Sequence, residues 1–248
     1  MDITPYLQRI NYKGSLTPSA ETLRNLQVAH LLNVPFENLS IHAHEPIVLN
    51  DEALFSKIVE RRRGGFCYEC NGLFAALLRE LGFDVSMLSG EVANESGGFS
   101  QPFDHMTLMV KLEETWLVDV GFGDSFLEPL RIDKSTDQIQ GSQAFRISGD
   151  DPYRVVYRRY DSQWKPEYRF TLQPYNYSDF EAMCRYHQTS PQSHFTQKRV
   201  CSLATREGRM TLSDMRFIVT RDGVREERNL EGSKEYKDIL LEQFGIVM

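Results

Sequence analysis

Cys67 stands where a reactive thiol could be held at the start of a buried helix. It follows Gly64 and Gly65, and the apolar residues after it fall at positions 73, 74, 77, 78 and 81, the spacing of one helical face. Unpaired N–H groups at a helix start favour an anion, so we expect the thiol to be shifted toward its thiolate form. The glycine pair would leave room for a substrate carbonyl. The alternative is an inert core cysteine, which most free cysteines are.

His105 and Asp119 are the two other side chains with chemical potential. His105 opens an apolar strand pattern, and Asp119 lies inside the next one, 115–120, after a Glu113-Glu114 turn. Alone, the first resembles a hydrogen-bonded rim histidine and the second a turn aspartate. In a hairpin, however, Asp119 could reach an imidazole N–H. Together with Cys67 they supply the nucleophile, proton carrier and orienting carboxylate that acyl transfer through a thioester requires.

Composition restricts the class of protein. The 248 residues are 41% hydrophobic, enough for a large core, and the net charge of -7 argues against nucleic-acid and anionic-membrane partners. Four cysteines are too few for a disulfide scaffold of this length, and neither a signal peptide nor a run of about 20 apolar residues is visible. These features predict a cytoplasmic protein.

The periodicity changes along the chain. Residues 1–83 have helical patterns, including one capped near Thr17 or Ser19 and another that begins at Asn50-Asp51 and continues to Val59. Beyond Gly82 the apolar residues alternate, which predicts strands at 84–92, 105–112, 115–120, 145–147, 153–158 and 167–172. A helix over 178–187, strands at 198–205, 210–212 and 216–220, and a closing helix over 234–244 follow. An antiparallel sheet or small barrel is therefore expected in the middle of the chain.

Several segments resemble the arylamine N-acetyltransferase family. Residues 63–71, Arg-Gly-Gly-Phe-Cys-Tyr-Glu-Cys-Asn, are similar to its Arg-Gly-Gly-x-Cys-x-Glu-x-Asn segment. Other segments that match in the family's order are 34–39, the His105 segment, 119–123, 189–195 and 201–209. The resemblance extends from Tyr6 to about Leu212.

The resemblance implies an α+β fold with three domains. These would be a helical N-terminal domain (1–84) carrying the cysteine, an antiparallel β-barrel domain (85–188) carrying the histidine and aspartate, and an α/β lid domain (189–248). The triad would be arranged as in cysteine proteinases.

The resemblance also implies a ping-pong reaction without a metal. Acetyl-CoA would acetylate Cys67, and an aromatic amine, hydrazine or N-hydroxyarylamine would accept the acetyl group. Phe103, Gly121 and Phe122 are suggested for binding the cofactor, and Phe36 and Asp104 for binding the acceptor.

Four rival interpretations use the same residues. A cysteine hydrolase or transglutaminase-like enzyme shares the order Cys, His, Asp and is the main alternative. A thiol–disulfide oxidoreductase would use Cys67 and Cys70 but lacks a preceding βαβ pattern. A zinc module would need a second close cysteine pair, whereas Cys184 and Cys201 are far apart. A protein that binds CoA without turnover is the fourth.

Two local hypotheses concern the neighbours of Cys67. Cys70 lies three residues on, so mild oxidation is expected to form a reversible, inactivating Cys67–Cys70 disulfide. Arg61-Arg62-Arg63 is most simply a solvated helix end, but one arginine buried against Glu37 or Glu69 would brace the glycine turn.

Overall fold

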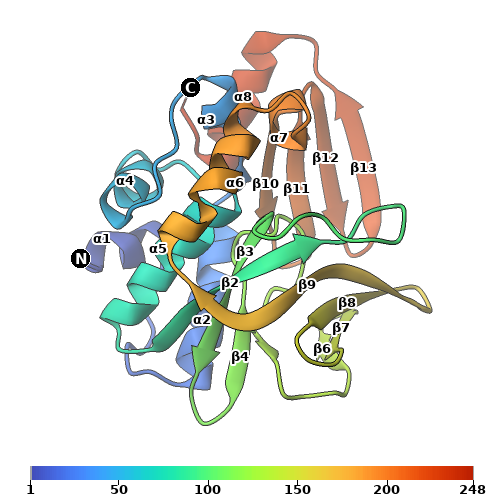
Figure 1. Ribbon diagram of the computed structural model, residues 1–248. Coiled ribbons are helices and arrows are strands. Elements are labelled where there is room, and N and C mark those ends of the chain that lie inside the picture. Colours follow the sequence, from blue (N-terminus) through green and yellow to red (C-terminus); the bar gives the residue numbers. More distant parts are fainter. Residues whose placement is uncertain (1, 248) are drawn as a thin grey trace.

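The computed structural model describes residues 2–247. Its helices are α1 (Thr4–Arg9), α2 (Ala20–Asn33), α3 (Leu39–His42), α4 (Asp51–Phe55), the π-helix η1 (Ser56–Glu60), α5 (Cys67–Glu80), α6 (Tyr177–Thr189), α7 (His194–Gln197) and α8 (Ser233–Phe244). Its strands are β1 (Phe36–Glu37), β2 (Asp84–Val92), β3 (His105–Lys111), β4 (Thr115–Val118), β5 (Leu130–Arg131), β6 (Gln138–Gln140), β7 (Gln143–Ser148), β8 (Arg154–Tyr160), β9 (Gln163–Tyr175), β10 (Val200–Ala204), β11 (Gly208–Ser213), β12 (Arg216–Arg221) and β13 (Val224–Asn229). Figure 1 shows the N-terminal helices gathered on one side of the two sheets. None of the helices in the described range has the length and apolarity needed to cross a membrane.

The early helices begin at the predicted caps. Ser19 accepts the N–H of Thr22 at 3.1 Å at the start of α2, and Asn50 accepts that of Ala53 at 2.8 Å at the start of α4. The expected helix continues past Val59, but it changes type, because α4 ends at Phe55 and the chain widens there into the π-helix η1. This π-helical turn carries Lys57, which is buried at 5% exposure.

Helix α5 is the centre of the molecule, and only its last two residues, Arg79 and Glu80, are exposed. Its apolar side chains pack against the N-terminal helices, against β2 and β3, and against Phe180 and Cys184 of α6. Figure 1 shows α6 running in front of α5. Because α5 is enclosed from several sides, the position of Cys67 at its first residue is fixed by packing of the whole core.

The larger sheet is antiparallel, in the order β5-β4-β3-β2-β9-β8-β7-β6, and curls into a nearly closed barrel. The predicted β3–β4 hairpin is confirmed, with Leu108 opposite Val118. Gln138 links the two edge strands, since its Oε1 accepts the N–H of Arg131 at 2.8 Å and its Nε2 donates to the Arg131 carbonyl at 3.0 Å. This side chain therefore replaces backbone pairing at the barrel seam.

The second sheet is also antiparallel, in the order β1-β10-β11-β12-β13, and α8 packs on it. The predicted strands at 198–205, 210–212 and 216–220 correspond to β10, β11 and β12. The sequence analysis did not predict β13, which is a charged, fully exposed edge strand without an alternating apolar pattern. Strand β1 ties the sheet to the N-terminal region, since Phe36 pairs with Ser202.

Candidate active site

Cys67 lies on the wall of a cavity of about 420 Å³ and is itself only 3% exposed. Burial raises the pKa of its thiol well above the ordinary value, although a hydrogen bond from the backbone of Met106 opposes this. This direction is opposite to the expected shift toward a resting thiolate, because desolvation by burial is the largest influence on this thiol. Attack by this sulfur requires a neighbouring base to take its proton.

His105 is the base that the geometry provides. It is the first residue of β3 and lines the same cavity as Cys67. Its Nε2 lies 2.6 Å from Oδ2 of Asp119, which leaves Nδ1 as the ring nitrogen for a reacting group. The rings of Phe122 and Tyr168 flank the imidazole at centroid distances of 5.2 and 5.0 Å. The ring is thus held in one orientation.

Asp119 follows β4 directly and is buried in a network of hydrogen bonds. Its Oδ1 accepts from Asn71 Nδ2 and from the N–H of Gly121, both at 2.9 Å. Burial alone would raise the pKa of this carboxyl, but the charge of His105 and the hydrogen bonds from His105, Asn71 and Gly121 lower it. Asp119 is therefore ionised and placed to stabilise a protonated His105.

Asn71 joins the nucleophile helix to this network and was not singled out from the sequence. It lies one turn after Cys67 on α5 and is fully buried. Besides its bond to Asp119, its Nδ2 donates to the Met106 carbonyl at 2.6 Å and its Oδ1 accepts the N–H of Val120 at 2.8 Å. One side chain thus fixes α5 against both β3 and the Asp119 loop.

Buried ion pairs brace the turn before Cys67. Arg63 Nη2 lies 2.9 Å from Glu37 Oε1, so the expected arginine–glutamate pair is confirmed. The sequence analysis missed Lys57, whose Nζ lies 2.7 Å from Oε1 of Glu69. Glu69 Oε2 also accepts the N–H of Phe66 at 3.2 Å. Two carboxylates, of Glu37 and Glu69, and two cationic side chains, of Lys57 and Arg63, therefore neutralise one another's charge behind the nucleophile.

Gly64 and Gly65 in this turn make room for neighbouring parts of the protein. A Cβ at Gly64 would come 1.9 Å from the carbonyl oxygen of Pro35, and one at Gly65 would come 2.6 Å from Glu69. The expectation that these glycines leave room for a substrate carbonyl is therefore wrong. Their missing side chains permit the close contact of β1 with the turn, in which Glu37 donates its N–H to the Gly65 carbonyl at 2.9 Å.

Four of the five residues suggested for ligand binding line the cavity. They are Phe36, Asp104, Gly121 and Phe122. Phe103 is not among the lining residues, since its ring packs against Tyr175 and Phe180 at centroid distances of 4.8 and 5.3 Å. Its backbone is in the left-handed region, with φ 67°, and its carbonyl accepts the hydroxyl of Tyr68 at 2.6 Å. Phe103 thus anchors the loop before His105 to Tyr175 and Phe180 and does not contact the cavity.

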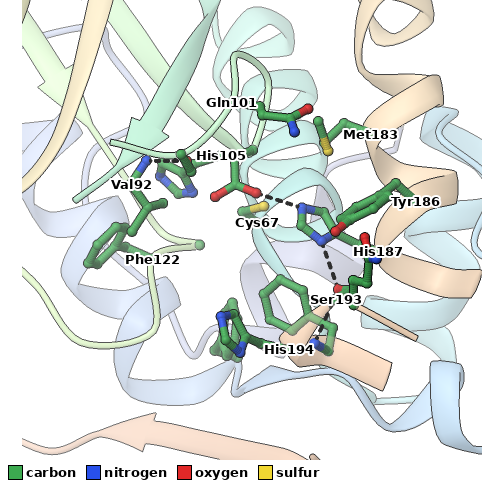
Figure 2. A pocket seen from close by; sticks show the side chains of 16 residues that line it. Cys67, Val92, Gln101, His105, Phe122, Met183, Tyr186, His187, Ser193 and His194 are labelled. Carbon is green, nitrogen blue, oxygen red and sulfur yellow. Dashed lines mark hydrogen bonds and ion pairs between the residues drawn. The ribbon is translucent and has the colours of Figure 1, made fainter. Parts of the chain in front are cut away.

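Helices α6 and α7 form the wall that the sequence analysis did not identify. Figure 2 shows His187 on the opposite side of Cys67 from His105, with Ser193 beyond it. The segment 189–195 resembles the family, but its residue pattern does not indicate which of its side chains point into the cavity. The lining residues from this wall are Met183, Tyr186, His187, Gln192, Ser193, His194 and Phe195.

The remaining features concern the cysteines and a metal site. All four cysteines are free and buried, and Cys70 Sγ donates to the Gly65 carbonyl at 3.1 Å. The Cys67–Cys70 disulfide stays a prediction. Within residues 2–247, no group of three or more His, Cys, Asp or Glu side chains is arranged to hold a metal ion.

Comparison with known proteins identifies the family. A family model described as N-acetyltransferase matches residues 19–248. The arylamine N-acetyltransferase of Mycolicibacterium smegmatis is 35% identical, with 99% of this chain and 92% of the relative covered, and that of Escherichia coli is 34% identical, with 97% and 87% covered. The solved structure of Mycobacterium marinum arylamine N-acetyltransferase in complex with CoA is 33% identical, superposes with a TM-score of 0.92, and is matched over 99% of this chain and 93% of its own. The chain belongs to the arylamine N-acetyltransferase family.

Proposed function

We propose that this chain transfers an acetyl group from acetyl-CoA through a thioester on Cys67 to an aromatic amine, a hydrazine or an N-hydroxyarylamine. The observation that carries the proposal is the buried His105–Asp119 pair, at 2.6 Å, on the wall of the cavity that also contains Cys67. The family supports acetyl transfer, because its members here are named arylamine N-acetyltransferases and one of them was solved in complex with CoA.

The first half-reaction loads the enzyme. His105 Nδ1 takes the proton of Cys67 as the sulfur attacks the thioester carbonyl, and Asp119 stabilises the imidazolium through Nε2. The tetrahedral oxyanion would be met by the first-turn N–H groups of α5, at Cys67 and Tyr68, which have no carbonyl partner within the helix. When the intermediate collapses, CoA leaves with the proton from His105, and acetyl-Cys67 remains.

The second half-reaction uses the same groups. The amine attacks the carbonyl of acetyl-Cys67, and His105 accepts the proton that the nitrogen loses. Collapse of the intermediate breaks the bond to sulfur, and His105 returns a proton to Cys67.

The cavity suits an aromatic acceptor. The rings of Phe36, Phe122 and Phe195 line it, and Asp104 gives it a polar group. We propose Phe36 and Asp104 as acceptor contacts, and Gly121 and Phe122 as contacts for the thioester end of acetyl-CoA. The cysteine hydrolase or transglutaminase-like alternative is not favoured, since the relatives are acetyltransferases. Four free cysteines are in keeping with a reducing cytoplasm as the site of action.

Initial-rate kinetics test the proposal. Rates are measured over a grid of acetyl-CoA and 4-methoxyaniline concentrations, with CoA release and acetylated product followed separately. Parallel double-reciprocal lines are expected, because CoA leaves before the amine reacts. Intersecting lines, or CoA release without acetylated amine, would contradict the proposal. Cys67→Ser should abolish transfer, whereas Cys201→Ala, in the core beneath the second sheet, should retain it.

A further inference from the structure

Among residues 2–247, the cavity beside Cys67 is lined by one acidic side chain, that of Asp104, and by no Lys or Arg. The side chain of Asp104 is 22% exposed, so part of the carboxylate faces the cavity. It is close enough to Cys67 for its charge to add to the raised pKa of that thiol. A ligand that reaches the sulfur therefore lies near a carboxylate.

His187 and Ser193 hold Asp104 from the opposite wall. Oδ1 of Asp104 lies 3.2 Å from Nε2 of His187, and Nδ1 of His187 lies 3.0 Å from Oγ of Ser193. Figure 2 shows the imidazole of His187 connected in this way to Ser193. His187 is 5% exposed and Ser193 is 2% exposed, so the chain of three side chains is built into the protein.

The partners determine which nitrogen of His187 carries a proton. Ser193 Oγ accepts the N–H of Phe195 at 3.2 Å, so its hydroxyl proton is available for Nδ1 of His187. A neutral imidazole with Nδ1 as acceptor carries its hydrogen on Nε2, the atom that faces Asp104. This Nε2 is buried and has no well-aligned hydrogen bond among residues 2–247, although it is at ion-pairing distance from the carboxylate.

Burial alone would raise the pKa of the Asp104 carboxyl. Hydrogen-bonding contacts with His187 and Ser100 and the charges of His187 and His105 lower this pKa, so Asp104 keeps its negative charge. A carboxylate has acceptor sites beyond the one that faces His187.

We propose that Asp104, positioned by His187 and Ser193, selects acceptors by charge: the enzyme prefers aromatic amines with a cationic or hydrogen-bond-donating substituent over those with a carboxylate. The inference rests on the proposed function and specifies its substrate class. An amide or amidine on the acceptor ring can donate to Asp104, whereas a carboxylate there would face the negative charge of Asp104, and no Lys or Arg in the described part of the chain lines the cavity to offset that repulsion. Because aromatic and aliphatic side chains supply much of the lining, water screens this repulsion poorly.

Three acceptors of nearly the same shape test the proposal. They are 4-aminobenzoate, 4-aminobenzamide and 4-aminobenzamidine, which are negative, neutral and positive. The wild-type kcat/KM should rise in that order, with the acid at least about tenfold below the amide. The intrinsic reactivity of the amino group runs the other way, because the carboxylate withdraws electrons least. An increase of kcat/KM from the acid through the amide to the amidine would therefore be caused by the protein and not by the reactivity of the amine.

Asp104→Asn removes the charge while keeping the shape, and the amide-to-acid ratio should fall by about tenfold. The ratio is compared within each variant, so a general loss of activity cancels. Asp84→Asn is the matched control, because it removes the same charge from an exposed position at the start of β2 and should leave the ratio unchanged. A wild-type enzyme that uses the acid as well as the amide, or an unchanged ratio in Asp104→Asn, would overturn the proposal.

A second measurement needs no variant. Benzoate, benzamide and benzamidine lack the amino group and should inhibit wild-type acetylation of 4-methoxyaniline with increasing strength in that order. Equal inhibition by all three would overturn the proposal as well. If acetyl-CoA acetylates Cys67 but neither series depends on charge, this inference fails and the proposed function stands. If Cys67 is not acetylated at all, the proposed function fails and this inference fails with it.

Discussion

Gly121 is the point at which the Asp119 loop touches the start of α5, and adding one methyl group there should disturb catalysis. A Cβ at Gly121 would come 2.7 Å from the Cα of Cys67, 2.9 Å from its carbonyl oxygen and 2.8 Å from Nδ2 of Asn71. The first contact is about 0.7 Å short of the 3.4 Å at which ordinary contact begins. Two of these atoms belong to the backbone and the third to a fully bonded side chain, so none can turn away.

Gly121→Ala must therefore separate the Cys67 helix from the loop that holds Asp119. Overpacking of this kind costs about 1–3 kcal/mol of folding stability, or a melting temperature lower by about 2–4 °C per kcal/mol in a chain of this size. The effect on rate should be larger, because a displacement of up to about 0.7 Å between nucleophile and base lowers kcat/KM by roughly 10- to 100-fold.

The assay compares wild type, Gly121→Ala and Gly98→Ala. Gly98 is a suitable control because a Cβ there would approach Asn94 no closer than 3.4 Å, in an exposed loop. Acetyl transfer, the rate of Cys67 alkylation by iodoacetamide and thermal unfolding are measured for each. Wild-type activity in a folded Gly121→Ala variant would refute the reasoning, since it would mean that the loop and the helix are not in rigid contact.

Three other predictions follow from the same structure. Asp119→Asn should remain folded but lose on the order of a thousandfold in kcat, because the amide cannot stabilise the His105 imidazolium; kcat within tenfold of wild type would argue against this role. Burial raises the pKa of Glu167 to about 7, so its protonated form contributes stability that is present below pH about 4.5 and is lost as pH rises through 7. Glu167→Gln should therefore gain stability relative to wild type between pH 5 and 8, and melting curves showing the opposite trend would contradict this sign. Mild oxidation should form the Cys67–Cys70 disulfide and abolish activity reversibly; thiol counting that finds both thiols free in inactivated enzyme would exclude this mechanism.

The parts of the site that could be predicted are those with a local pattern. The helical spacing after Cys67 correctly indicated α5, and the alternation around Glu113-Glu114 indicated the β3–β4 hairpin. A buried arginine paired with Glu37 or Glu69 was only the second interpretation of residues 61–63, and the structure shows that Arg63 pairs with Glu37.

What could not be predicted depends on contacts between distant segments. The raised pKa of Cys67 reflects how completely the rest of the chain buries it, which no local pattern reports. Lys57 is buried in the π-helical turn that follows α4, and apolar periodicity indicates neither the change of helix type nor a buried lysine. His187 gains its position only when α6 crosses α5 and brings it toward Asp104, 83 positions earlier in the chain.

The central claim is that the sulfur of residue 67 carries the acyl group between two substrates, and intact-protein mass spectrometry tests it most directly. Wild-type protein incubated with acetyl-CoA and freed of excess ligand should gain the mass of one acetyl group. Peptide mapping should locate that group on Cys67, and adding 4-methoxyaniline should remove it with formation of one equivalent of acetylated amine. Cys67→Ala should gain nothing. No acetyl group on wild-type protein, an equal gain in Cys67→Ala, or an acetyl group that the amine cannot remove would contradict the account.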